Sequence, residues 1–315
     1  MTLESAVVFL QEMLMLYGIT ALGFITRKSG ILDKHANDVL TQLILYITLP
    51  ALILFSLDIR FSVSLAKEFT WLIAMSVYIL MVSCVLAFWM RQNARLPAKQ
   101  KSVYEGLIIF GNQGFIGYAV SFILLGEKGI VYLTIFNLCY LILIWTYGVY
   151  LFHQNNAKTI NWKNILLNPG ILSTLAGITI FLFPISFPDI VSTGLESVGK
   201  MTIPLSMILI GSLIANIPCK EFFILIKNSY LWKAAASKLV LLPATLFIFA
   251  FFSVPLPVLL IAVIVSGMPS APTITLYSQR YGGDTLFASI GVLLTTILCI
   301  LTIPFLYFMV GFLHN

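Results

Sequence analysis

Two adjacent carboxamides, Asn112 and Gln113, lie in a segment that is otherwise apolar enough to cross a membrane. They belong to the heptapeptide Gly111–Gly117 (GNQGFIG), in the middle of the apolar run Tyr104–Leu125. Each glycine weakens a helix by about 1 kcal/mol relative to alanine, and polar side chains in hydrocarbon must find partners. The pattern predicts two half-helices separated by an unwound stretch. Because non-helical backbone at membrane depth is tolerated only inside protein or along a wet cavity, this stretch is a candidate binding site.

A second stretch of the same kind, Gly267–Thr273 (GMPSAPT), interrupts the apolar run Pro257–Gln279. Each break is expected to expose backbone N–H groups at the start of a second half-helix, near Gly114–Tyr118 and near Ser270–Thr273. Such helix N-termini carry roughly half a positive charge and favour anions. With carboxamide and hydroxyl donors beside them, the breaks predict a carboxylate as the guest.

The candidate residues divide into binding and structural roles. Predicted binding residues are Asn112, Gln113, Gly114, Gly117, Tyr118, Asn137, Pro269, Ser270, Ala271 and Thr273. Hinge or structural roles are predicted for Gly111, Pro50, Pro204 and Pro272. Two plainer interpretations remain open, because spaced glycines also permit close helix packing and a polar residue such as Asn137 also joins neighbouring helices. No metal site and no cofactor is predicted.

The elements that must position these residues are membrane helices. The chain has 315 residues, of which 60% are hydrophobic and only 10% charged, far from the composition of a soluble domain. About 20 apolar residues cross a hydrocarbon core of roughly 30 Å. We therefore predict an all-α polytopic membrane protein with ten spans: Ala6–Thr26, Asp38–Leu57, Phe69–Met90, Tyr104–Leu125, Gly129–Phe152, Leu166–Phe183, Leu195–Ala215, Leu231–Phe252, Pro257–Gln279 and Leu286–Phe312.

The basic residues predict the orientation of these spans. Loops on one side would carry thirteen of the 18 cations, namely Arg27, Lys28, Lys34, Arg91, Arg95, Lys99, Lys101, Lys158, Lys163, Lys220, Lys227, Lys233 and Arg280. Loops on the other side would carry three, namely Arg60, Lys67 and Lys128. The positive-inside rule then places both termini on the extracytoplasmic side of the cell membrane. Cations spread over short loops do not indicate nucleic acid binding.

The remaining two cations lie within spans. Lys200 follows Glu196 at the i, i+4 spacing of a helical ion pair, which predicts a surface feature. Lys238 lies within about two turns of the expected cytoplasmic end of its span, so we expect it to extend towards the interface; a role in substrate binding is the alternative.

A weak internal repeat relates the two halves of the chain. Thr48-Leu49-Pro50 recurs as Thr202-Ile203-Pro204, an offset of 202 minus 48, or 154 residues, which also carries Gly114 onto Met268. Two halves of five spans each, an odd number, enter the membrane from opposite sides, which makes an inverted repeat. The predicted organisation is a first repeat at 1–152, a cytoplasmic linker at 153–165 and a second repeat at 166–315.

The sequence offers no carrier for enzymatic chemistry. No Walker loop, HExxH motif or nucleophile elbow is present, and no Asp or Glu is expected near the membrane midplane. The four cysteines are far apart, and the three histidines lie in expected loops or the tail. We therefore expect a protein that is not an enzyme.

Taken together, these motifs resemble the auxin efflux carrier family of membrane transporters, which includes bacterial malate and malonate permeases. The resemblance extends over nearly the whole chain and depends on Leu22–Phe24, Gly30–Asp33, Leu49–Ala51, Gly111–Gly117, Ile203–Leu205, Ile210–Leu213, Lys238–Pro243, Met268–Ala271 and Arg280–Asp284. One departure is Ala119, where the family usually has proline after the last glycine of the fourth-span motif.

The resemblance implies ten helices in two inverted repeats, with broken fourth and ninth helices crossing at the substrate site. It further implies a homodimer formed through scaffold helices, the first two of each half, and an elevator-type movement that exports or exchanges small organic anions. A membrane ligand sensor and an anion channel are the alternatives that the sequence leaves open.

Overall fold

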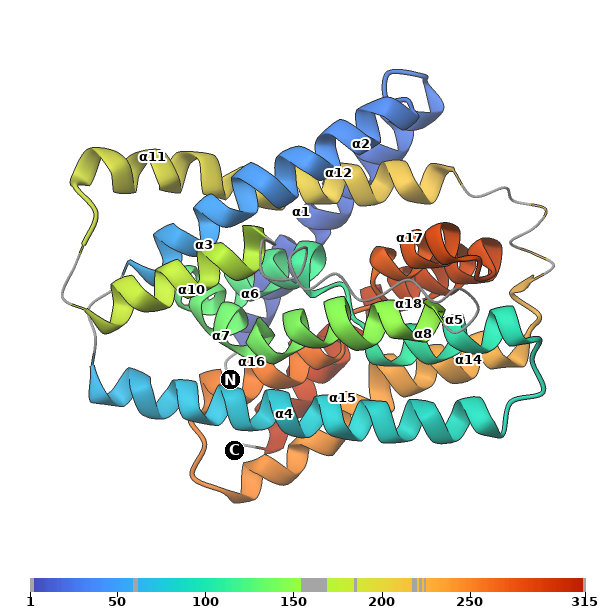
Figure 1. Cartoon of the computed structure of the whole chain (residues 1–315). Coiled ribbons are helices and arrows are strands. Elements are labelled where there is room, and N and C mark those ends of the chain that lie inside the picture. The colour runs from blue at the N-terminus through green and yellow to red at the C-terminus, as the bar shows by residue number, and fades with distance from the viewer. Residues whose placement is uncertain are drawn as a thin grey trace. The chain divides into compact units, whose positions relative to one another are not determined.

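Helices form nearly all of the structure, which is a computed structural model (Figure 1). It describes residues 3–58, 62–153, 169–183, 186–216, 220, 223 and 225–313. Within these residues no strand forms, and the β-type pairing present is an antiparallel bridge between Gly111 and Ser270. The helices and helical turns are α1 (Leu3–Lys28), α2 (Lys34–Leu43), η1 (Ile44–Thr48), α3 (Leu49–Leu57), α4 (Val63–Gln92), α5 (Ala98–Ile109), η2 (Gln113–Gly117), α6 (Tyr118–Leu125), α7 (Glu127–Leu143), η3 (Ile144–Gly148), α8 (Val149–His153), α10 (Pro169–Leu182), α11 (Asp189–Lys200), α12 (Thr202–Ala215), α14 (Ser229–Ala236), η4 (Ser237–Leu241), α15 (Leu242–Thr245), η5 (Leu246–Phe251), α16 (Leu256–Ser266), α17 (Pro272–Tyr281) and α18 (Thr285–Leu313).

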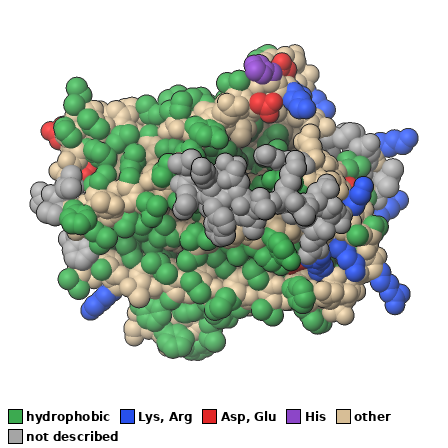
Figure 2. All heavy atoms as spheres, viewed as in Figure 1, with side chains coloured by type: hydrophobic (Ala, Val, Ile, Leu, Met, Phe, Trp, Pro, Cys, Tyr) green, Lys and Arg blue, Asp and Glu red, His purple; other side chains and the backbone are tan. Residues whose placement is uncertain are grey.

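Several helices have the length and composition of membrane spans. In the described part of the chain six helical segments qualify: Lys34–Leu57, Val63–Gln92, Glu127–Phe152, Asp189–Ala215, Ser229–Phe251 and Thr285–Phe312. Large apolar side chains on them face outwards; Val85 is 71% exposed and Leu301 is 73% exposed. On the face drawn in Figure 2 apolar side chains dominate, and Lys and Arg side chains lie mostly at its margins. This is a multi-pass, all-helical membrane protein.

The two helices predicted to be broken are interrupted. The first interruption lies between α5, which ends at Ile109, and η2, which begins at Gln113. The second separates α16, which ends at Ser266, from α17, which begins at Pro272. Pro272 suits the first position of α17, because its fixed φ matches a helix and its missing N–H has no partner there.

The chain forms two compact units, and each takes segments from both predicted halves. Unit 1 comprises Met1–Thr70, Gly114–Leu138 and Trp162–Asn216, and unit 2 comprises Trp71–Gln113, Cys139–Asn161 and Ile217–Asn315. The predicted linker 153–165 lies outside the described residues except for His153. The predicted repeats at 1–152 and 166–315 are halves of the sequence that correspond to each other, and they are not the same as the two compact units. That division remains a prediction.

Unit 1 depends on close backbone contacts at small residues. Helix α1 packs along α12, where a Cβ on Gly211 would lie 1.9 Å from the carbonyl oxygen of Thr20. Helices α10 and α11 lie beside α3 (Figure 1), and a Cβ on Gly199 would lie 2.7 Å from the Leu52 backbone. Small residues at such contacts let membrane helices approach closely, which favours dispersion contacts where the hydrophobic effect gives little help.

Unit 2 packs the second interrupted helix into its interior. Every residue of α16 from Val258 to Ser266 is buried, and α18 packs against α5, α14 and α16. The α5–α18 contact is close at Gly291, where a Cβ would lie 2.4 Å from Leu107 Cδ1. The interrupted segment before α17 is therefore held between buried helices.

Three helices change their hydrogen bonding just before a proline. The N–H of Leu49 bonds to Ile44 O before Pro50, and the N–H of Leu242 bonds to Ser237 O before Pro243. These i to i+5 bonds belong to π-type turns. They change the backbone hydrogen bonding of the helix next to a proline, which has no N–H to donate. Before Pro204 the change occurs at Met201, between α11 and α12. Hinge motion at Pro50 and Pro204 remains a prediction.

Substitution of Gly23 by alanine tests the close packing of α1 on α12. A Cβ at Gly23 would lie 2.2 Å from Ile208 O and 2.7 Å from Ile208 Cα, so the two backbones must separate. We expect Gly23→Ala to lower the free energy of unfolding by about 1–3 kcal/mol, the usual effect of overpacking. Thermal unfolding of detergent-purified protein measures the change.

The matched control is Gly18→Ala in the same helix, because nothing lies within 4 Å of the added methyl group. That variant should be neutral or stabilised by up to about 1 kcal/mol, since alanine is the better helix former. Equal melting temperatures for Gly23→Ala and wild type would contradict the described α1–α12 contact.

Candidate functional site

The two unwound segments of unit 2 pair with each other through their backbones. Asn112 N donates to Pro269 O at 2.6 Å, and Ala271 N donates to Phe110 O at 2.9 Å. These two bonds flank Gly111 and Ser270, which form the antiparallel bridge. The pairing satisfies backbone groups that neither half-helix can satisfy, which is required where water is excluded. We call residues 110–112 and 267–271 the crossover.

The first interruption is shorter than the glycine pattern suggests. Only Phe110–Asn112 is unwound, whereas Gly114 and Gly117 lie in the helical turn η2. Gly111, Gly114 and Gly117 all have negative φ, so none is needed there for a left-handed backbone. The unwound residues are held by their pairing with 269–271, and a role of the three glycines in weakening the helix remains a prediction.

Buried hydroxyl groups complete the hydrogen bonding of the crossover. Tyr140 donates to Gly111 O at 2.7 Å. Ser270 donates through Oγ to Leu107 O at 2.7 Å, and its N–H donates to Thr295 Oγ1 at 3.0 Å. Neither Tyr140 nor Thr295 was among the predicted site residues. A Thr hydroxyl often bonds the backbone of its own helix, as Thr295 also does, and the sequence does not show which way the Tyr140 ring points. Their contribution becomes visible only in the folded structure.

A lysine lies against the crossover, contrary to its expected position at the interface. Lys238 on η4 is only 3% exposed, and its Nζ lies 3.3 Å from Ile109 O at the end of α5. The same Nζ would be 3.0 Å from a Cβ on Gly111, so glycine leaves room for the ammonium group. The expectation that Lys238 extends to the membrane surface is therefore wrong; η4 directs the side chain inward, and its amino group lies beside the break.

The carboxamides of the motif, which follow Gly111 in the chain, are buried. Asn112 and Gln113 are 3% and 4% exposed. The side-chain Oε1 of Gln113 has no hydrogen-bond partner among the described residues, and its N–H donates to Gly111 O. A buried acceptor without a partner is unfavourable, and only a group that donates a hydrogen bond can satisfy it. Gly111, Asn112, Pro269, Ser270 and Ala271 are thus brought together, with Gln113 next in the chain.

The other predicted binding residues of the first half form a polar group in unit 1. The Tyr118 hydroxyl lies 3.1 Å from Thr134 Oγ1, and Asn137 lies beside the same hydroxyl. All three side chains are buried, and Asn137 Oδ1 has no partner among the described residues. Gly114 and Gly117 precede this group on η2. Binding roles for Gly114, Gly117, Tyr118 and Asn137 remain predictions.

Thr273, the last predicted binding residue, occupies the first turn of α17 and is half-buried. Its hydroxyl forms no hydrogen bond in the described part of the chain. A binding role for Thr273 remains a prediction.

A second buried charge in unit 2 is fully paired. Glu105 on α5 has no exposed surface; its Oε2 accepts from Arg91 Nη1 at 2.8 Å, and its Oε1 accepts from the Tyr147 hydroxyl. Both carboxylate oxygens are engaged, so Glu105 ties α4, α5 and η3 together. It has no free oxygen with which to neutralise another cation.

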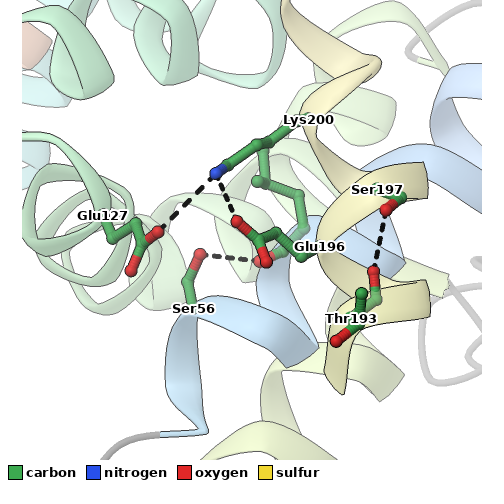
Figure 3. Close-up of polar contacts among 7 residues, drawn as sticks. Ser56, Glu127, Thr193, Glu196, Ser197 and Lys200 are labelled. Atoms are coloured by element: carbon green, nitrogen blue, oxygen red, sulfur yellow. Dashed lines mark hydrogen bonds and ion pairs between the residues drawn. The ribbon is translucent and has the colours of Figure 1, made fainter. Parts of the chain in front are cut away.

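The predicted ion pair of Lys200 is confirmed at the surface of unit 1 (Figure 3). Lys200 Nζ pairs with Glu196 Oε1 one turn earlier on α11, and lies 3.8 Å from Glu127 Oε1 at the start of α7. The three side chains are 36–56% exposed. Exposed ion pairs contribute little stability, and the ion pairs of these three side chains are with one another and not with residues of the crossover. In the described residues no group of His, Cys, Asp and Glu is arranged to hold a metal ion.

Comparison with known proteins adds two findings. The family model described as "Membrane transport protein" matches residues 8–307. An uncharacterized transporter of Methanocaldococcus jannaschii is 24% identical over 201 residues, which cover 61% of this chain. The match spans 65% of that relative's length, less than two thirds.

Substitution of Thr295 by valine tests the support of the crossover. Valine keeps the shape but removes the acceptor of the buried Ser270 N–H. An unsatisfied buried donor costs about 1–3 kcal/mol, so the free energy of unfolding should fall by that amount. Chemical or thermal unfolding in detergent measures it.

The neighbouring Thr296→Val is the control, because the Thr296 hydroxyl bonds only Val292 O of its own helix. Its effect should be well below that of Thr295→Val. Equal effects of the two variants would show that Ser270 N does not depend on Thr295.

Proposed function

Because this chain belongs to the membrane transport protein family, the family of the auxin efflux carriers, we propose that it is a secondary carrier for a small organic anion. The substrate class is a mono- or dicarboxylate such as malate or malonate. The observation that carries this proposal is the buried amino group of Lys238 beside the crossover.

The charge of the site favours an anion. In the described part of the chain Ile109 O is the hydrogen-bond acceptor of Lys238 Nζ, which leaves ammonium donors for a guest. A carboxylate accepts hydrogen bonds only, so it suits ammonium, carboxamide and helix N-terminal donors alike. Asn112 and Gln113 provide carboxamides at the same break, and the first turn of α17 follows Ala271. These donors support a carboxylate over a cationic guest.

We further propose ten crossings arranged as two inverted repeats, with both termini on the extracytoplasmic side. Within unit 1 the Thr202 hydroxyl donates to the Thr48 hydroxyl at 2.9 Å, a contact between residues 154 positions apart. The α1–α12 packing joins predicted spans 1 and 7, and the α3–α10 packing joins spans 2 and 6. An inverted repeat that relates span 1 to 6 and span 2 to 7 exchanges these two contacts and maps the Thr48–Thr202 contact onto itself. This pattern supports the repeat.

The composition of the two units supports an elevator-type mechanism. Unit 1 gathers predicted spans 1, 2, 6 and 7, which the family resemblance assigns to a dimerising scaffold, together with Gly114–Leu138. Unit 2 gathers spans 8, 9 and 10 with most of span 3 and the crossover. In the proposed mechanism unit 2 moves with the bound anion, and the scaffold helices form a homodimer in the cell membrane.

Flux measurement in proteoliposomes tests the carrier directly. Purified protein should give saturable uptake of labelled malate or malonate and counterflow when the lumen holds the unlabelled anion. Ligand-induced thermal stabilisation without counterflow would indicate a sensor. A linear flux with single-channel conductance would indicate a channel. Absence of saturable flux for every carboxylate tried, with folded protein, would reject the proposal.

Substitution of Asn112 by alanine tests the carboxamide contact. Loss of a buried hydrogen-bond partner should weaken anion binding by about 1–3 kcal/mol, roughly 5- to 150-fold in Kd. Titration of thermal stabilisation by malate or malonate measures the Kd.

Asn93→Ala is the control, since Asn93 is exposed and bonds only Trp89 O. It should bind the anion as wild type does. If Asn112→Ala also binds normally, the motif serves helix packing alone.

A further inference from the structure

Lys238 presents an unbalanced charge in the interior of unit 2. Its nearest polar partner is Ile109 O, at the C-terminal end of α5, where the helix dipole supplies only about half a negative charge. In the described part of the chain no carboxylate lies within 4.0 Å of its Nζ. A buried ammonium without a full counter-charge is strongly unfavourable.

Neighbouring elements do not supply the missing charge. Helices α5, α14, α15 and α18 pack against η4, and Ser237 contacts Met90 of α4. The titratable or charged groups of these helices are Lys67, Glu68, Tyr78, Cys84, Arg91, Lys99, Lys101, Tyr104, Glu105, Tyr230, Lys233, Cys299 and Tyr307, and Tyr140 contacts the crossover. Both carboxylates among them have other partners: Glu105 is held by Arg91 and Tyr147, and Glu68 by Lys128 and Tyr132.

From this placement we propose that Lys238 takes up one proton together with each substrate carboxylate and releases it when the carboxylate leaves. The inference rests on the proposed carrier function and adds its coupling ion. On one side of the membrane the neutral amine, a proton and the carboxylate combine to form an ammonium–carboxylate pair. On the other side the pair separates into the same three species. The empty carrier returns with a neutral amine, so proton and anion move in the same direction.

The coupling has a defined charge consequence. A monocarboxylate crosses without net charge, because its single negative charge is matched by the proton on Lys238. A dianion such as malonate at neutral pH crosses with one net negative charge. The proton flux therefore equals the anion flux in both cases, whereas the electrical current depends on the substrate.

Counting protons tests the proposal in the wild-type protein. Vesicles that contain a lumenal pH dye receive labelled malonate, with the membrane voltage clamped at zero by potassium and valinomycin. We expect one proton to enter for each malonate, and a pH difference of one unit, acid outside, to drive about tenfold accumulation. Protein-free vesicles correct for permeation of the protonated acid. Saturable malonate uptake with an unchanged lumenal pH would overturn proton coupling and leave the carrier function intact.

Substitution of Lys238 by arginine separates binding from coupling. Arginine stays charged in proteins, so Lys238→Arg supplies the counter-charge but cannot return empty as a neutral group. We expect it to retain malonate counterflow and to lose net, proton-linked uptake. Lys233→Arg is the control, since Lys233 is exposed on α14; it should retain both activities.

The two tests remain informative if one fails. Wild-type net uptake in Lys238→Arg would overturn the role of Lys238. If that variant does not fold, the wild-type proton count decides alone. Absence of malonate flux in wild type, with no other carboxylate transported, would instead reject the carrier function and the coupling with it.

Discussion

The need to satisfy buried backbone groups controls the architecture of unit 2. A helix that stops inside a membrane protein leaves N–H and C=O groups without partners, and hydrocarbon offers none. Here the two interrupted helices pair with each other through Gly111 and Ser270. Two further carbonyls accept from side chains on other helices: Gly111 O from Tyr140, and Ile109 O at the end of α5 from Lys238. The break therefore has defined hydrogen-bond partners from other helices.

What this pairing leaves unsatisfied defines the chemistry of the site. The bridge pairs the backbones of the two breaks, but the Gln113 Oε1 has no partner and the Lys238 amino group has no carboxylate partner in the described residues. Glu105 illustrates the contrast, because the same helix holds a buried charge with both oxygens engaged. A buried group with all its partners stabilises a fold, whereas one without them favours a guest. The two charges of unit 2 therefore have different roles in the proposed carrier.

Local composition was enough to locate the interruptions, because carboxamides, glycines and prolines in long apolar runs are unfavourable for continuous helices. The family assignment followed from the same motifs. Local composition could not identify the partners. Tyr140, Thr295 and Lys238 lie far from the motif in sequence, and their direction depends on the geometry of other helices. Lys238 is the clearest case: a π-type turn before Pro243 sets which way its side chain points, and the hydrophobic pattern of Leu231–Phe252 contains no record of that turn.

The physical role of a glycine can also differ from its most familiar explanation. Glycine at 111 suggests backbone freedom, yet its φ is ordinary, and what glycine provides is space for an ammonium group at 3.0 Å. Gly126 and Gly282 do have positive φ, and each ends the helix that follows an interruption. The two kinds of glycine thus have separate physical tasks. A side chain at Gly111 would displace the Lys238 head, whereas one at Gly126 or Gly282 would strain the backbone itself. Gly111 therefore belongs to the electrostatics of the site and not to its flexibility.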